Sequence, residues 1–403
     1  MLKKLILGLL CIGMAGSILG GCGSLQDSTT VAATAAKIES TSAATNASSA
    51  ETSTATTYPE LDLNPTTALS VSADGVQAVA PSALTLTDAE IQTLKDGNFT
   101  VAFSYHTQSD TCNQTKLAAA KASLEGWGVE VVSVTDANFN AQTQVSDIES
   151  TMALKPDVLI VMPYDADATA SALKANVMGT DTKIVFMENV ATGFKPGTDY
   201  LACVSSDSYG NGKASADIMA KQLNYKGTVA MMFYDLSFYV TNERDRGFRE
   251  TMEKYYPDIK IVMESGFTDV NNTGTVADAI FAKYPDINGI YASWDVPAEG
   301  AIATANSLGR KDIVITCCDL GDTAASMIAT DGMIRGTGAP RSAAQGEAEA
   351  LVAAYGLLGK ALPSTFITPP ALPVVKANLL DGYFACYGIE APDSIKKLVE
   401  ANK

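Results

Sequence analysis

Residues 99–134 read FTVAFSYHTQSDTCNQTKLAAAKASLEGWGVEVVSV, and this stretch decides the fold. Its two apolar runs, Thr100–Ser104 and Val129–Val134, are short and rich in residues that favour strands buried on both faces. Between them, Asn113–Trp127 has the length and apolar spacing of an amphipathic helix. A strand, a helix and a strand in this order predict a βαβ unit with parallel strands.

The same alternation continues along the chain and starts again near residue 228. Further strands are predicted at Asp157–Met162, Lys183–Met187, Tyr200–Val204, Thr228–Phe233, Lys260–Ser265, Gly289–Ala292, Asp312–Cys317 and Ile334–Gly338. Further helices are predicted at Gln142–Ala153, Thr169–Val177, Asn211–Leu223, Thr241–Tyr255, Thr275–Lys283, Ala298–Leu308, Thr323–Ala329 and Ala343–Leu358. Two successive series predict an α/β fold with two doubly wound parallel-sheet lobes.

The N-terminal residues have a different character. Lys3 and Lys4 precede an apolar run that ends near Leu19, and small residues stand directly before Cys22, which is typical of a secretory signal. This end resembles the bacterial lipobox, which implies cleavage before Cys22 and lipidation of its thiol. An ordinary signal peptide with an incidental cysteine is the alternative.

Composition shifts then suggest the division of the chain. The stretch after Cys22 is nearly all Ser, Thr and Ala, so it cannot bury enough surface to offset its ordering entropy. We expect a signal peptide at 1–21, a disordered tether at 22–57, a lead-in segment at 58–98, a two-lobed domain at 99–377 and a C-terminal extension at 378–403. The lead-in segment is predicted to end in a helix capped by Thr87 or Asp88.

Charge and cysteine content exclude several classes of function. The formal net charge is −17 and no run of Lys or Arg occurs, so we expect no nucleic-acid binding and no broad contact with anionic lipid. After Cys11 and Cys22 the cysteines are odd in number and form no Cys-x-x-Cys pair, so we interpret them as small core residues. They are Cys112, Cys203, Cys317, Cys318 and Cys386.

Catalytic signatures are nearly absent from the sequence. His106 is the only histidine, and a strand–helix junction separates it from Cys112, which disfavours a Cys-His nucleophile. Gly210-Asn-Gly-Lys-Ala-Ser imitates a phosphate loop, but Ala214 stands where Ser or Thr is needed. No set of residues has metal-ligand spacing. We therefore expect that the protein is not an enzyme and that it has neither a cofactor nor a metal site.

Polar and aromatic side chains follow the predicted strands, where open α/β sheets bind their ligands. Candidates of this kind are Asp110, Tyr164, Glu188, Tyr239, Asn242, Phe267, Trp294, Asp295, Asp319 and Arg341. Carboxylates and amides hydrogen-bond vicinal hydroxyls, and aromatic rings pack against C–H faces, so a sugar or polyol ligand is predicted.

Some of these strand-end residues also have a structural alternative. Glu188 and Asp319 have no basic neighbour in sequence, and an unpaired core carboxylate is costly, which favours a ligand role. Trp294 could instead belong to the core. Arg244 is as well suited to a structural ion pair as to a ligand contact.

The region from Phe99 to Ala377 resembles the ribose-type periplasmic binding proteins, the solute receptors of carbohydrate ABC transporters. The resemblance rests on the order and spacing of Met162-Pro-Tyr-Asp-Ala-Asp-Ala, Val204-Ser-Ser-Asp-Ser-Tyr-Gly-Asn-Gly, Asn242-Glu-Arg-Asp-Arg-Gly-Phe, Tyr284-Pro-Asp-Ile-Asn-Gly-Ile-Tyr-Ala, Trp294-Asp and Asp319. It implies a non-catalytic protein whose lobes close on a sugar. It also implies ligand contacts at Glu188, Asn242, Phe267, Trp294 and Asp319.

The resemblance further implies three crossings between the lobes, which we expect near Asp207, Pro340 and Phe366. The first lobe would then hold about 99–207 and 341–366, and the second about 208–340 and 367–377. This sequence departs from the family at three places: Glu188-Asn189 stands for the usual Asp-Arg, Trp294 for Asn, and Ser109-Asp110-Thr111 for an aromatic pair. Ribose as the ligand therefore does not follow.

These observations lead to one main hypothesis and two alternatives. The main one is a monomeric, lipid-anchored receptor on the extracytoplasmic face of the cell membrane, in a Gram-positive cell, which delivers a sugar or polyol to an ABC permease. The first alternative is a sensory receptor for a small signal molecule or nucleoside. The second is a surface glycoside-processing enzyme.

Overall fold

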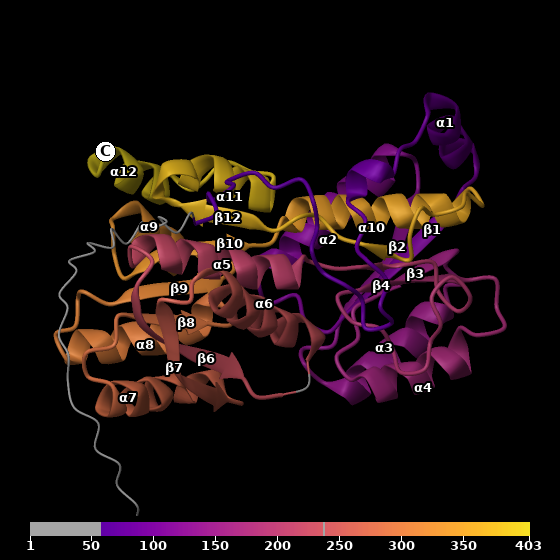
Figure 1. Cartoon of the computed structure of the whole chain (residues 1–403). Coiled ribbons are helices and arrows are strands. Elements are labelled where there is room, and N and C mark those ends of the chain that lie inside the picture. The colour runs from indigo at the N-terminus through magenta and orange to yellow at the C-terminus, as the bar shows by residue number, and fades with distance from the viewer. Residues whose placement is uncertain (1–57, 237) are drawn as a thin grey trace, which may run out of the picture. The chain divides into compact units, whose positions relative to one another are not determined.

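The structure, a computed structural model, describes residues 58–236 and 238–403. The predicted signal peptide, Cys22 and the tether lie outside the described residues. Within the described part, the strands form two six-stranded sheets with helices packed on them (Figure 1). The predicted α/β fold with two parallel-sheet lobes is confirmed.

The first lobe is built on a fully parallel sheet with the order β11-β5-β4-β3-β1-β2. Its strands are β1 (Thr100–Tyr105), β2 (Glu130–Asp136), β3 (Val158–Val161), β4 (Lys183–Met187), β5 (Cys203–Val204) and β11 (Phe366–Ile367). Its helices are α2 (Thr111–Gly126), α3 (Ala141–Met152), α4 (Ala166–Asn176) and α10 (Ser342–Leu357). The strand predicted at Tyr200–Val204 is shorter in the structure, where β5 begins only at Cys203. Tyr200 instead pairs with Pro196 in an isolated bridge.

The second lobe repeats this plan with the order β12-β10-β9-β8-β6-β7, in which only the edge strand β12 is antiparallel. Its strands are β6 (Gly227–Tyr234), β7 (Ile259–Phe267), β8 (Gly289–Ala292), β9 (Val314–Cys318), β10 (Ile334–Ala339) and β12 (Leu372–Val375). Its helices are α5 (Ser208–Gln222), α6 (Tyr239–Tyr255), α7 (Thr273–Lys283), α8 (Asp295–Ser307) and α9 (Asp322–Ala329), with a short 3-10 turn at η2 (Val270–Asn272).

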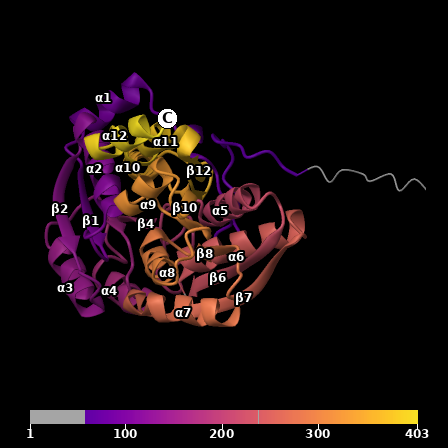
Figure 2. The same ribbon diagram turned by 90° about the vertical axis from the view of Figure 1, so that its left-hand side faces the viewer.

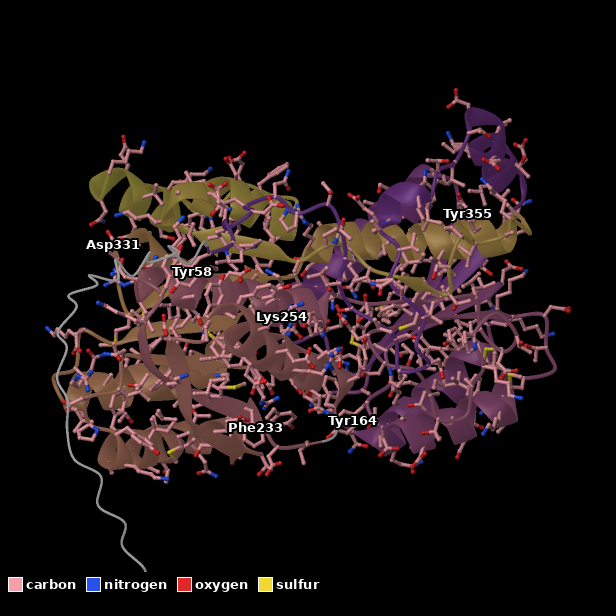
Figure 3. All side chains as sticks on the ribbon, in the orientation of Figure 1. Tyr58, Tyr164, Phe233, Lys254, Asp331 and Tyr355 are labelled. Carbon is pink, nitrogen blue, oxygen red and sulfur yellow. The ribbon has the colours of Figure 1, made fainter. Side chains whose placement is uncertain are left out.

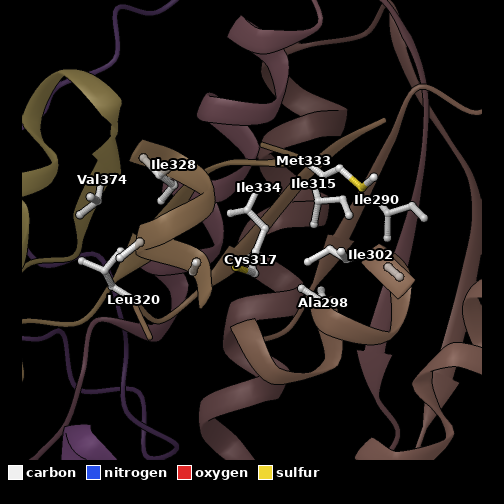
Figure 4. Close-up of a cluster of buried hydrophobic side chains, with 14 of the residues drawn as sticks. Ile290, Ala298, Ile302, Ile315, Cys317, Leu320, Ile328, Met333, Ile334 and Val374 are labelled. Carbon is white, nitrogen blue, oxygen red and sulfur yellow. The ribbon is translucent and has the colours of Figure 1, made fainter. Parts of the chain in front are cut away.

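Both faces of each sheet are buried, as the apolar strands predict. Cys317 belongs to the cluster of buried residues on one face of the second sheet (Figure 4), and Cys318 belongs to the cluster on the other face. The five described cysteines are free, and four of them are buried. Helices α5 and α6 approach each other closely (Figure 2). Gly212 and Gly247 permit this approach, because a Cβ at either position would overlap backbone atoms of the other helix.

Three short segments carry the chain between the lobes, and we call them the hinge. They are 205–207 after β5, 340–341 after β10 and 368–371 after β11. The third begins two residues beyond Phe366, which itself lies in β11.

The segments on either side of the two series are ordered parts of the fold. Residues 58–98 include η1 (Pro81–Ala83) and α1 (Asp88–Asp96), whose N-cap is Thr87 in a capping box with Glu90. At the other end, η3 (Lys376–Asn378), α11 (Leu379–Tyr387) and α12 (Asp393–Ala401) follow β12. Helices α11 and α12 add Tyr383, Tyr387 and Ile395 to the core of the second lobe.

Candidate functional site

A buried carboxylate lies at the end of β4 in the first lobe. Glu188 has a φ of +58° and is only 8% exposed, and its Oε1 lies 2.5 Å from the Nζ of Lys116 on α2. Its oxygens also accept hydrogen bonds from Gln345 on α10 at 2.9 Å, from Ser205 at 2.8 Å and from the Ser206 amide at 3.1 Å. The sequence offered no basic partner for Glu188 because Lys116 is 72 residues away.

These contacts hold Glu188 in its charged form. Burial alone would raise the pKa of Glu188, but the charge and hydrogen bond of Lys116, together with Gln345 and Ser206, outweigh it and lower the pKa to about 2. Both oxygens are saturated by protein donors, so Glu188 acts here as a structural centre that joins α2, α10 and the first hinge segment.

The second lobe carries an ion pair at the corresponding position. Asp319 follows β9 with a φ of +66°, and its two oxygens accept from the two terminal nitrogens of Arg244 at 2.8 and 2.9 Å. The side chain of Arg244 is 8% exposed, whereas that of Asp319 is 20% exposed. Arg244 therefore forms a structural ion pair, which is one of the two roles that the sequence allowed. Asp319 remains accessible to solvent.

Asp295 and Asp110 gather near Asp319. Asp295 begins α8 and accepts a 2.7 Å hydrogen bond from the amide of Gly321. Burial, and then the charge of Asp319, raise the pKa of Asp295 to about 7. Asp110, on the first lobe, is the N-cap of α2, and its pKa is raised by burial and, to a smaller extent, by Asp319 on the other lobe.

Each lobe also presents a cluster of aromatic rings. In the first lobe Tyr164 stands edge-on to Phe139, with ring centres 5.9 Å apart, and both are largely exposed. In the second lobe Trp294 lies 5.4 Å from both Tyr234 and Phe267. Trp294 is half-buried against the core of its lobe, while Phe267 is a core residue at 3% exposure.

A cavity of about 470 Å³ brings together four of the predicted residues, Tyr164, Glu188, Tyr239 and Asn242. It takes residues from both lobes. The full lining is Ser72, Ala73, Asp74, Pro163, Tyr164, Ala166, Glu188, Asn189, Val190, Tyr200, Cys203, Phe238, Tyr239, Asn242, Glu243, Thr365 and Phe366.

The other predicted residues do not line this cavity. Arg341 donates instead to the carbonyl of Pro370 at 3.1 Å and to Oδ1 of Asn64 at 2.8 Å, so it belongs to the hinge. Asp110, Asp295 and Asp319 form the separate carboxylate group described above. Phe267 and Trp294 form the aromatic cluster of the second lobe.

Sequence reasoning missed several cavity residues. Asn189, directly after Glu188, has a buried Nδ2 without a hydrogen-bond partner among the described residues. Its place after β4 could have identified it. Ser72 and Asp74 come from the lead-in segment, which has no periodic pattern, so nothing in the sequence pointed to them.

The family described as "Periplasmic binding protein domain" matches residues 101–361. The chain belongs to this family. The ribose import binding protein of Bacillus subtilis (strain 168) is 26% identical over 218 residues, which cover 54% of this chain and 68% of that protein. The D-apiose import binding protein of Actinobacillus succinogenes is 26% identical over 222 residues, with shares of 55% and 69%.

Solved structures agree on the fold of this periplasmic binding protein. An ABC transporter solute-binding protein from Agrobacterium vitis, bound to α-D-tagatopyranose, has a TM-score of 0.64 at 23% identity and covers 73% of this chain and 100% of that one. A D-allose-bound solute-binding protein from Actinobacillus succinogenes has a TM-score of 0.62 at 21% identity, with shares of 70% and 99%. Family membership places the chain among the binding proteins of transporters and not among enzymes.

The described residues contain neither a metal-binding cluster nor a membrane-spanning helix. No group of three or more His, Cys, Asp or Glu residues there could hold a metal ion. Likewise, no helix in 58–236 or 238–403 combines the length and apolar character that a membrane span requires.

Proposed function

We propose that this periplasmic binding protein is the solute receptor of an ABC importer, and that it binds a sugar or polyol between its lobes and delivers it to a permease. The observation that carries the proposal is the Arg244–Asp319 pair at the end of β9. Asp319 is fixed by two hydrogen bonds, yet it remains 20% exposed, so it has lone pairs to offer to a ligand hydroxyl.

The surroundings of this pair suit a polyhydroxylated ligand. Trp294 offers an aromatic face for C–H groups, and Asn189 and Asn242 line the 470 Å³ cavity with amides. Relatives and structural neighbours are described with ribose, D-apiose, tagatose, D-allose and myo-inositol, which share vicinal hydroxyls. Ligand binding would draw the lobes together through rotation at the hinge.

A thermal-shift screen tests the proposal. A protein of residues 58–403 would be melted with D-ribose, D-apiose, D-tagatose, D-allose, D-arabinose, xylitol and myo-inositol, with L-alanine as a control. A true ligand at a hundredfold over its dissociation constant should add about 2.7 kcal/mol of stability. If no sugar or polyol moves the melting temperature more than L-alanine, the proposal is wrong.

We also propose that the receptor is held at the outer face of the cell membrane by lipid on Cys22. The basis is the small residues before Cys22 and the Ser, Thr and Ala stretch that follows it. Several acyl chains, at about 0.8 kcal/mol per buried CH₂, give stable anchoring. Cys22→Ala should therefore move the protein from the membrane fraction to the soluble fraction on blots, and unchanged retention would contradict a lipid anchor at this residue.

A further inference from the structure

Residues 58–86, which we call the belt, precede the family match at 101–361 and connect the two lobes. The belt begins on the second lobe, where the Tyr58 ring stacks on Tyr225 with centres 4.0 Å apart. It ends on the first lobe, where the Tyr355 hydroxyl donates to the carbonyl of Thr85 at 3.0 Å. Figure 3 labels Tyr58 and Tyr355, and they lie on different lobes.

Between these ends the belt contacts the hinge. The carboxylate of Asp207, in the first hinge segment, accepts from the amides of Leu69 and Ser70 at 3.0 and 2.8 Å and from the Ser70 hydroxyl at 2.9 Å. The same carboxylate accepts from the amide of Ala371 in the third segment at 3.3 Å. Ser70 and Asp207 are almost fully buried. The belt therefore forms part of the polar core of the hinge, where a buried carboxylate needs these donors.

A hairpin follows directly after this contact. Val71 pairs with Gln77 in an antiparallel bridge, and Gly75 turns the chain with a φ of +81°. The hydroxyl of Tyr239, at the start of α6, donates to the carbonyl of Val71 at 2.6 Å. Ser72, Ala73 and Asp74 at its tip line the 470 Å³ cavity. Among the described residues no side chain donates to the carboxylate of Asp74, so it is available to a ligand.

The belt then joins the first sheet beside β11. The Val79 amide donates to the carbonyl of Phe366, and the Thr368 amide donates to the carbonyl of Val79, at 3.0 and 2.9 Å. Val76 and Ala78 pack on the cluster of buried residues that contains Cys203 and Phe366. Cys203 also lines the cavity. The belt thus covers one side of the cavity and of the sheet edge.

We propose that the belt is part of the ligand-binding machinery: it is a fourth connection between the lobes, its hairpin closes one side of the cavity, and Asp74 is a specificity-determining residue for a hydroxyl-bearing ligand. The proposal rests on the proposed function only for the identity of the ligand. Two parts of the proposal do not depend on any ligand: the belt docks on the hinge, and it shields Cys203 from solvent.

The first experiment uses no ligand. In the full chain, Ser70→Ala combined with Val79→Pro removes one hydroxyl bond to Asp207 and the amide bond to Phe366. Maleimide labelling, located by peptide mass spectrometry, should then modify Cys203 several times faster than in the wild type. Cys317 and Cys318, in the core of the second lobe, are internal controls that should stay unreactive. Unchanged labelling of Cys203 would overturn the proposed cover.

A second ligand-free measurement covers the case in which the double variant unfolds and all three thiols react. In the wild-type chain, amide hydrogen exchange at Leu69, Ser70 and Val79 should be slow, comparable with that in the adjoining strands. Exchange at the rate of an unprotected peptide would overturn the docking of the belt, whatever the variant does.

The role of Asp74 is tested with the sugar that shifts wild-type melting most in the panel above. Asp74→Ala should weaken binding in calorimetric titration about ten- to hundredfold, the range for a lost hydrogen bond to a charged group, with the melting temperature unchanged. Asp88→Ala, on the exposed start of α1, is the matched control and should bind as the wild type does. Equal binding by Asp74→Ala would overturn the specificity role. If no panel member binds the wild type, the proposed function fails, while the labelling and exchange results still decide the belt.

Discussion

The two lobes use the same ion pair in different ways. In each, the helix after the first strand supplies a cation to the carboxylate that follows the fourth strand: Lys116 to Glu188 in the first lobe, and Arg244 to Asp319 in the second. Both carboxylate residues have a positive φ, which is strained for a residue with a Cβ and persists only when the surroundings fix it. The repeated fold thus repeats an electrostatic feature.

The surroundings make the difference. Gln345 and the hinge serines cover Glu188 and donate to its oxygens. Among the described residues, by contrast, the carboxylate of Asp319 accepts only from Arg244, and it remains partly exposed. The same position in the fold therefore carries a structural pair in one lobe and a pair open to a ligand in the other. Variants of the two pairs should accordingly separate stability from binding.

The largest effect is expected at Lys116. Lys116→Met leaves Glu188 as a buried charge without its cation, which should cost about 3–5 kcal/mol of unfolding free energy. Urea unfolding measures this, and Lys121→Met on the same helix is the control. The double variant Lys116→Met/Glu188→Gln should recover much of the loss because it removes both charges. A loss below about 1 kcal/mol in the single variant would contradict the structural role of the pair.

Truncation of Trp294 should affect binding in the second lobe. Trp294→Ala removes an aromatic face at the end of β8 and should weaken sugar binding by about 2–4 kcal/mol. Since Trp294 also packs on Tyr234 and Phe267, the melting temperature should fall as well, and Trp294→Phe should restore more of the stability than of the binding. Calorimetric titration and melting of both variants separate the two contributions. Normal binding by Trp294→Ala would show that this cluster belongs to the core alone.

These residues show which features of the structure could be predicted from the sequence and which could not. Apolar strands alternating with amphipathic helices predict both sheets, because strand burial is a local pattern. The pairing of Glu188 with Lys116 is not local: the two residues are 72 positions apart, one on α2 and the other directly after β4, so sequence neighbours could not reveal it. The contacts of the belt could not be predicted for a different reason. It is held by backbone hydrogen bonds and single side chains, as at Ser70, and such contacts leave no periodic pattern.

Asp319→Asn should show the opposite behaviour to Glu188→Gln. Loss of the charge at Asp319 should weaken sugar binding by about 1.5–3 kcal/mol, the range for a hydrogen bond to a charged group. Its effect on unfolding should be smaller than that of Glu188→Gln, because water reaches Asp319 in the unliganded protein. Asp322→Asn, exposed at the start of α9, is the control for titration and melting. If Glu188→Gln weakens binding more than Asp319→Asn does without loss of stability, the assignment of the two pairs must be exchanged.

The smallest effect concerns Glu349 on α10, which faces the first pair. Its side chain is fully buried, and neither oxygen has a hydrogen-bond partner among the described residues. Burial raises the pKa of Glu349 to about 8; the Lys116 charge opposes this rise, whereas the Glu188 charge adds to it. The hydroxyl of Tyr105, also buried without a partner, lies under the influence of the same carboxylate.

The sign of the pH effect follows from this raised pKa. Below about pH 4.5 Glu349 is neutral in both the folded and the unfolded chain, so folding loses nothing there. Between about pH 4.5 and 8 the unfolded chain ionises while the folded protein keeps the proton on Glu349, so stability falls as the pH rises.

Glu349→Gln should therefore change the melting temperature little at pH 5 and raise it at pH 8.5, where the gain in unfolding free energy should be about 1–3 kcal/mol. Asp295 titrates in the same range in both proteins, so the difference between variant and wild type isolates Glu349. Glu347→Gln, exposed on the same helix, should show no such pH-dependent difference, and a flat difference for Glu349→Gln as well would mean that the folded protein holds Glu349 ionised beside Lys116.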